Sequence, residues 1–183
     1  MIDATTFARF SQFPELFRQS LIVDVDGEPK QFGGVMDGWQ SDDFAALDPG
    51  LERAVGRFDD PDAKMRVWLE RPRGHSKTCD LAVNCLWALC FATRPIRIFA
   101  YAADRDQARL LRDAAETLVR LNAAWLKFIV TVEQHKLVVT APGHPAEGST
   151  LVIGTSDVGS SYGILPDLVI CDEVSHWQGD GSL

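Results

Sequence analysis

A lysine-threonine pair behind a short loop is the feature of this sequence with the clearest chemistry. Lys77 and Thr78 follow the loop 71–76, which lies between an apolar run, residues 65–69, and a helix-like run from Thr78. In a strand, loop and helix of this order, backbone N–H groups point at an anion, the lysine reaches the β- and γ-phosphates, and the threonine hydroxyl ligates magnesium. We therefore expect a nucleotide-binding loop here, with residues 65–69 as its strand.

The loop departs from the usual pattern G-x-x-x-x-G-K-[ST] at both glycines. Arg71 stands six residues before Lys77, and Ser76 stands immediately before it. A Cβ close to the phosphates would narrow the site, so we expect Ser76 to impair efficient hydrolysis more than nucleotide binding. Taken alone, the segment is equally compatible with a loop that binds no nucleotide.

An acidic pair, Asp172-Glu173, follows a second apolar run, residues 167–171. A continuous apolar run is typical of a buried parallel strand, and the carboxyl ends of such strands form the ligand sites of open α/β sheets. Asp172 could hold magnesium through water, and Glu173 could accept a proton from the water that attacks the γ-phosphate. The alternative is a solvated acidic pair at the start of a helix or turn.

Composition indicates an ordinary globular chain, with no sign of a membrane span, a disulfide framework or a zinc site. The 183 residues are 46% hydrophobic and 24% charged, which suits one α/β domain, and no run is apolar enough for a membrane span or a signal peptide. The cysteines form no C-x-x-C pair and the histidines lack ligand spacing, so buried thiols are expected and neither a disulfide nor zinc. The cysteines are Cys79, Cys85, Cys90 and Cys171.

The net charge of −8 argues against a surface that binds nucleic acid over its whole extent. A local concentration of basic residues surrounds the lysine-threonine loop, where it suits phosphate contact better than duplex binding. These residues are Arg66, Arg71, Arg73 and Lys77.

Strands and helices are expected to alternate along the chain, which predicts an α/β fold with a mostly parallel sheet and helices on both faces. We expect residues 1–62 to form an N-terminal section and residues 63–183 to form the core. The expected helices are 6–20, interrupted at Pro14, one that starts near Gly38, 78–93, and an amphipathic helix over 104–122 capped by Asp104. The expected strands are 21–25, 65–69, 96–102, 128–132, 136–140, 150–154 and 167–171.

The order of the motifs resembles the ATPase domain of the large terminase subunit of tailed bacteriophages, a family that packages viral DNA. The resemblance covers about residues 38–177. The motifs that carry it are Trp39-Gln40, Arg73-Gly74-His75-Ser76-Lys77-Thr78, residues 100–108, Ser160-Ser161-Tyr162-Gly163, and residues 166–173. It implies a P-loop NTPase of the RecA/ASCE type, whose sheet is incomplete at the C-terminus and exposes an edge.

The resemblance also implies roles for individual residues. Lys77 would neutralise the phosphate oxygens, Arg73 would stabilise the transferring phosphoryl group in cis, and Glu173 would be the general base. Arg71 competes with Arg73 for its role, and both could be loop scaffolding. Thr78 and Asp172 would bind Mg²⁺. The residues expected to bind ATP are Gln40, Arg71, Gly74, His75, Ser76, Lys77 and Thr78, with the Gln40 amide on adenine unless it is a plain surface glutamine.

The same resemblance implies partners and a location. Double-stranded viral DNA, the portal protein, the small terminase subunit and further copies in a ring would be the partners, with no membrane contact. The place would be the cytoplasm of the infected bacterial host, transiently at the procapsid portal. The nuclease domain of the family has no counterpart in these 183 residues, so nuclease activity is not expected.

Two other interpretations remain open. One is a superfamily 2 helicase-like ATPase, although its Asp-Glu pair is normally followed by Ala and then Asp or His, whereas Val174-Ser175 follow here. The other is a degenerate module that binds nucleotide or partners without turnover, as Ser76 suggests.

Overall fold

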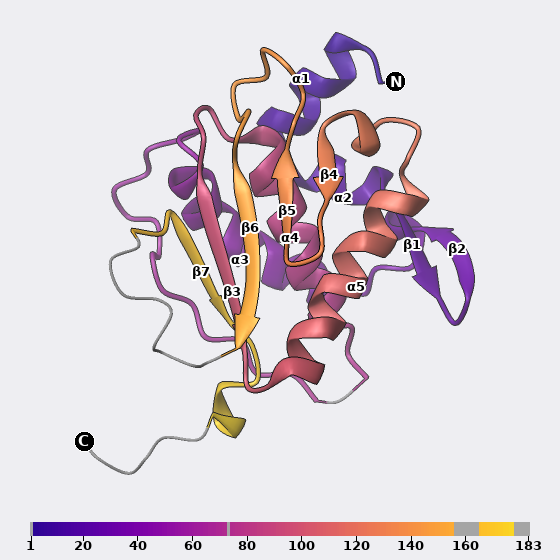
Figure 1. Ribbon diagram of the computed structural model, residues 1–183, viewed down its shortest axis with the longest axis vertical. Helices are drawn as coiled ribbons and strands as arrows, with labels where there is room; N and C mark the ends of the chain where they lie inside the picture. The colour runs from indigo at the N-terminus through magenta and orange to yellow at the C-terminus, as the bar shows by residue number, and fades with distance from the viewer. Residues whose placement is uncertain (1, 73, 156–164, 178–183) are drawn as a thin grey trace.

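A five-stranded mixed sheet organises the computed structural model, which describes residues 2–72, 74–155 and 165–177. The strand order is β4-β5-β6-β3-β7 (Figure 1). Strands β3, β6 and β7 are parallel, while β4 and β5 pair antiparallel and β5 pairs antiparallel with β6. Their bounds are β3 Arg97–Ala102, β4 Val130–Val132, β5 Lys136–Val139, β6 Thr150–Thr155 and β7 Leu168–Cys171. The sheet is thus mixed and not mostly parallel as predicted, because the predicted pair over residues 128–140 is a hairpin and its second strand also pairs antiparallel with β6.

Helices and a separate hairpin make up the rest of the described fold. The helices are α1 Ala4–Gln12, α2 Pro14–Ser20, α3 Gly38–Ala54, α4 Lys77–Phe91 and α5 Arg105–Leu121. The hairpin is β1 Ile22–Val25 with β2 Glu28–Gln31, and the short 3-10 turns are η1 Phe32–Gly34, η2 Leu126–Phe128 and η4 Val174–His176. Asp104 caps α5 as predicted, because its carboxylate accepts a hydrogen bond from the Gln107 N–H. No helix in the described ranges is long and apolar enough to cross a membrane.

Helix α4 is the centre of the core. Eleven of its fifteen residues are buried, as predicted from apolar residues on nearly all of its sides. The Trp87 indole N–H donates to the carbonyl of Phe10 at 2.9 Å, and the ring of Phe91 packs against those of Phe7 and Phe17. The N-terminal section therefore shares one core with the sheet.

The core lies on one face of the sheet. Ile98, Ala100 and Leu151 point into the cluster that contains α4 and α5. On the other face, Val169 is 46% exposed and Cys171 is also exposed, so the described helices leave this part of the second face uncovered. The alternation of strands and helices predicts cover on both faces, which the described residues do not provide there.

Residues 65–69 do not form the strand that their apolar character predicts. Met65 is 58% exposed and Trp68 is 67% exposed, and no backbone–backbone hydrogen bond joins residues 65–69 to other described residues. A groove of about 1020 Å³ separates this segment from β7. A strand requires a hydrogen-bonded neighbour, and the described residues supply none to this segment.

The position of this segment depends on a glycine in α3. A Cβ at Gly50 would lie closer to the carbonyl oxygen of Lys64 than real contacts allow. We predict that Gly50→Ala lowers the free energy of unfolding by about 1–3 kcal/mol, because overpacking outweighs the better helix propensity of alanine. Urea denaturation measures the change.

Gly38→Ala is the matched control for this substitution. Gly38 begins the same helix, and a Cβ there would meet nothing within 4 Å. This control should be neutral or slightly stabilising. Equal effects of the two alanines would show that the close approach of Lys64 to Gly50 has no energetic weight.

Candidate functional site

The lysine of the loop and the acidic pair meet at one point, although 96 residues separate Lys77 from Glu173. Lys77 is the first residue of α4, and Asp172-Glu173 follow β7 directly. The Lys77 Nζ donates to Glu173 Oε1 at 2.6 Å and lies 3.1 Å from Asp172 Oδ1. The predicted meeting of these three residues is therefore present in the fold.

Lys77 and Glu173 shift the pKa values of each other. Burial lowers the pKa of Lys77, but hydrogen bonds and charge attraction from both carboxylates outweigh burial and raise it. The hydrogen bond from Lys77 is the main cause that lowers the pKa of Glu173. At neutral pH, Lys77 is consequently a cation held between carboxyl groups, and Glu173 is a carboxylate with a weakened affinity for protons.

Two residues of the site have left-handed backbone conformations that favour glycine. Ser76, at the position where the loop pattern has glycine, has φ of 48°, and Glu173 has φ of 52°. Such conformations in residues other than glycine carry strain and collect at functional sites. The glycine of the usual pattern is thus explained by the backbone at this position, which Ser76 adopts at a cost.

The remaining loop residues have different surroundings. Gly74, His75 and Ser76 are exposed, and Thr78 is half-buried in the first turn of α4. The ring of His75 lies 5.1 Å from that of Trp39. Arg73 and the Ser160-Ser161-Tyr162-Gly163 motif fall outside the described residues.

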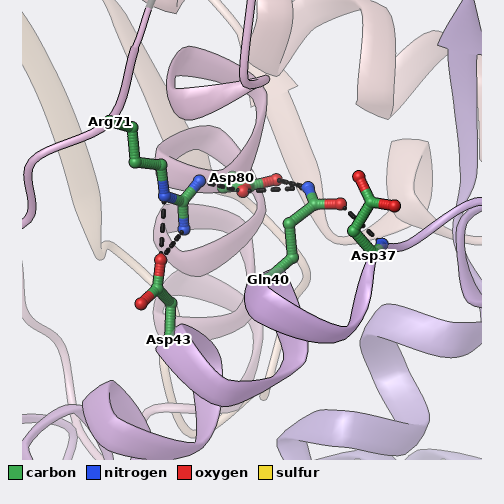
Figure 2. Close-up of polar contacts among 5 residues, drawn as sticks. All are labelled: Asp37, Gln40, Asp43, Arg71 and Asp80. Carbon is green, nitrogen blue, oxygen red and sulfur yellow. Dashed lines mark hydrogen bonds and ion pairs between the residues drawn. The ribbon is translucent and has the colours of Figure 1, made fainter.

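Arg71 and Gln40 lie together in a buried polar network (Figure 2). Arg71 Nε donates to Asp43 Oδ2 at 2.9 Å, and its Nη1 donates to Asp80. Gln40 Nε2 donates to both Asp80 oxygens at 3.0 and 3.1 Å, while its Oε1 accepts from the Asp37 N–H at 2.9 Å. Gln40 is only 4% exposed, so it is not a surface glutamine, and contact with adenine would require it to give up a partner.

Sequence reasoning missed Asp80 and Asp43. Asp80 is 3% exposed, and burial raises its pKa above the ordinary value, although the hydrogen bonds from Gln40 and Arg71 oppose the rise. The available signal was a carboxylate within the otherwise apolar run after Thr78, since a buried charge needs a partner. Nothing in the local sequence identifies Arg71 as that partner.

The fold is similar to the crystal structure of the HK97 bacteriophage large terminase, with a TM-score of 0.68 and 23% sequence identity. The similarity covers 89% of this chain and 31% of that one, so this chain spans about a third of the length of that protein. No protein-family model matches the chain, and no curated protein gives a significant match. The likeness of fold implied by the resemblance to large terminases is confirmed.

The backbone of Ser76 predicts the effect of restoring glycine. We expect Ser76→Gly to raise the free energy of unfolding by about 0.5–1 kcal/mol, because glycine accepts positive φ without steric strain. Urea denaturation measures the change. Ser41→Gly, in the exposed face of α3, should instead cost about 0.5 kcal/mol. A loss of stability on Ser76→Gly would mean that the serine side chain contributes more than the strain costs.

The ion pair of Glu173 predicts a dependence of stability on pH. Because the folded pKa of Glu173 is lowered below its ordinary value of 4.5, the stabilisation is present above pH 4.5 and is lost as pH falls through the folded pKa. Glu173→Gln should therefore cost about 1 kcal/mol or less at pH 7, since the side chain is 31% exposed, and less than that near pH 3.

Urea denaturation at the two pH values tests this dependence. Glu28→Gln, on the exposed strand β2, is the control and should change stability little at either pH. A cost of Glu173→Gln that is the same at pH 3 as at pH 7 would contradict the ion pair as its source.

Proposed function

We propose that this chain is a nucleotide-binding motor domain of the terminase large subunit kind, which hydrolyses ATP. The observation that carries the proposal is the junction of Lys77 with Asp172 and Glu173, where the start of α4 meets the end of β7. A cation at a helix N-terminus beside two carboxyl groups suits a triphosphate with a divalent cation. The terminase-like fold supports this kind of motor over a helicase-like ATPase.

The oxygen donors at this junction suit magnesium. Thr78 offers a hydroxyl and Asp172 a carboxylate, and Mg²⁺ is usually held by one or two such protein oxygens together with substrate phosphates and water. Among the described residues there is no group of three or more acidic, histidine or cysteine side chains that could hold a metal alone. The metal would neutralise charge on the phosphates during transfer.

The chemical role of Glu173 follows from its partner. Lys77 donates a hydrogen bond to Glu173. When a triphosphate draws the ammonium group of Lys77 to its own oxygens, Glu173 loses the contact that lowers its pKa. Its affinity for protons then rises, and it becomes a better base for the attacking water. Arg73, in the same loop, is proposed to stabilise the transferring phosphoryl group.

The likeness to a phage large terminase extends the proposal to the partners. We propose that the domain works in a ring with other copies, the small terminase subunit and the portal protein, and moves double-stranded viral DNA into a procapsid. This work would take place in the cytoplasm of the bacterial host. Nuclease chemistry is not part of the proposal for this chain.

A second candidate function is nucleotide binding without turnover. The strained backbone at Ser76 favours it, because the serine Cβ stands where the loop pattern has none. Phosphate release from the intact chain separates the two functions.

The proposal predicts different outcomes for two substitutions. Lys77→Ala should abolish magnesium-dependent binding of a fluorescent ATP analogue, because it removes the cation that meets the phosphates. Glu173→Gln should keep binding and lower the rate of phosphate release by about 10²–10⁴-fold. Both quantities are measured on the intact chain and on each variant.

Lys136→Ala is the control for loss of a lysine. Lys136 lies in β5, three places along the sheet from β7, and should leave binding and release unchanged. Turnover by Glu173→Gln at the rate of the intact chain would eliminate Glu173 as the base. Binding that survives in Lys77→Ala would eliminate the loop as the phosphate site.

A further inference from the structure

The two ends of the phosphate loop are tied to each other. Arg71 precedes the loop, and Asp80 lies in the first turn of α4, three residues after Lys77. Their side chains form an ion pair in which Arg71 is 5% exposed and Asp80 is 4% exposed. The pair therefore fixes Arg71, which precedes the loop, against the first turn of α4, which follows it.

Helix α3 holds both members of this pair (Figure 2). Asp43 contacts Arg71 at Nε and Nη2, at 2.9 and 2.8 Å, and Gln40 donates to both oxygens of Asp80. Gln40 and Asp43 are three residues apart, so they share one face of the helix. The loop is consequently attached to α3 at both of its ends.

The orientation of the Gln40 amide is determined by its neighbours. Its oxygen accepts from the Asp37 N–H, which leaves the NH₂ group to donate to the Asp80 carboxylate. A flipped amide would place oxygen against the carboxylate oxygens of Asp80. Gln40 thus has its donor and its acceptor engaged inside the protein.

Arg71 is held just as completely. Its guanidinium group contacts two carboxylates, and its central carbon lies 4.7 Å from the centroid of the Trp39 ring. A planar group fixed by ion pairs and an aromatic ring is a poor candidate for reaching out to a phosphate.

We propose that Gln40, Arg71 and Asp80 are positioning residues that fix the phosphate loop, and that Gln40 acts on the loop rather than on the base. The inference rests on the proposed nucleotide binding. It assigns to Gln40 a contribution that every ligand with a triphosphate group would share. Recognition of the base then does not depend on the Gln40 amide.

Inorganic tripolyphosphate separates the two roles of Gln40, because it has the phosphates of ATP and no base. Calorimetry gives the affinities of magnesium tripolyphosphate and magnesium ATP for the intact chain and for Gln40→Met, which keeps the bulk of the side chain. We expect both affinities to fall by the same factor, about tenfold or more, because tenfold corresponds to one charge-assisted hydrogen bond and Gln40→Met removes two of them. A lower affinity for ATP alone would overturn the proposal and would indicate that Gln40 contacts the base.

Asp80→Asn supplies a second test, because simple electrostatics and a positioning role predict opposite changes in ligand affinity. Removing a negative charge one turn from Lys77 would tighten the binding of an anion if charge alone mattered. A positioning role predicts weaker binding of both ligands, because Arg71 loses its charged partner. Tighter or unchanged binding by Asp80→Asn would overturn the role of the pair.

Controls separate these outcomes from loss of the fold and from failure of the proposed function. Gln12→Ala, at an exposed glutamine of α1, should bind both ligands as the intact chain does. Thermal unfolding followed by circular dichroism shows which variants are folded at the temperature of the titration, and the comparison uses those. An intact chain that binds neither ligand refutes nucleotide binding itself. An intact chain that binds both, with Gln40→Met and Asp80→Asn unchanged, refutes the positioning role alone.

Discussion

The burial of α4 on almost every side is the constraint on which the rest of the molecule depends. A helix surrounded by the sheet, by α5 and by the N-terminal helices can neither turn nor slide without opening the core. Its first residue is Lys77, so packing far from the loop determines where the ammonium group lies. The carboxyl groups after β7 are placed by the pairing of β7 with β3, in which the Asp172 N–H donates to the carbonyl of Tyr101 at 2.7 Å. The packing of α4 and the pairing of β7 with β3 therefore position the lysine and the carboxyl groups independently, and the two meet at one site.

Around this junction the chain departs from ordinary local rules in a consistent way. Ser76 and Glu173 have left-handed backbones, and a buried carboxylate, Asp80, lies in an apolar helix. Departures of this kind reduce stability and persist where the surrounding structure compensates for them. Here the compensation comes from ion pairs, since Lys77 joins Glu173 and Arg71 joins Asp80. The strained residues and the ion pairs that compensate for them therefore lie together, at the start of α4 and the end of β7.

The elements that the sequence predicted best are those with strong local signals. Helix α5 begins after a capping aspartate and carries one apolar face, and β7 ends directly before its acidic pair. The segment 65–69 misled the prediction, because apolar composition indicates burial in a strand but cannot supply a hydrogen-bonded neighbour. The network of Gln40 and Asp80 was also beyond reach, since forty residues separate its members and each is an ordinary polar residue in its local context. Contacts that join distant segments are visible only in the fold.

The thiol of Cys171 makes the candidate site accessible to chemical labelling. It is exposed and immediately precedes Asp172, whereas Cys85 and Cys90 are fully buried and Cys79 is half-buried. Burial raises the pKa of Cys79 and that of Cys85 to about 12, so these thiols have almost no thiolate at neutral pH. The pKa of Cys171 is also raised by burial, but its exposure allows slow alkylation. A fluorophore or spin label would therefore attach beside the acidic pair without any engineered cysteine, and the native chain carries its own reporter of events at that end of β7.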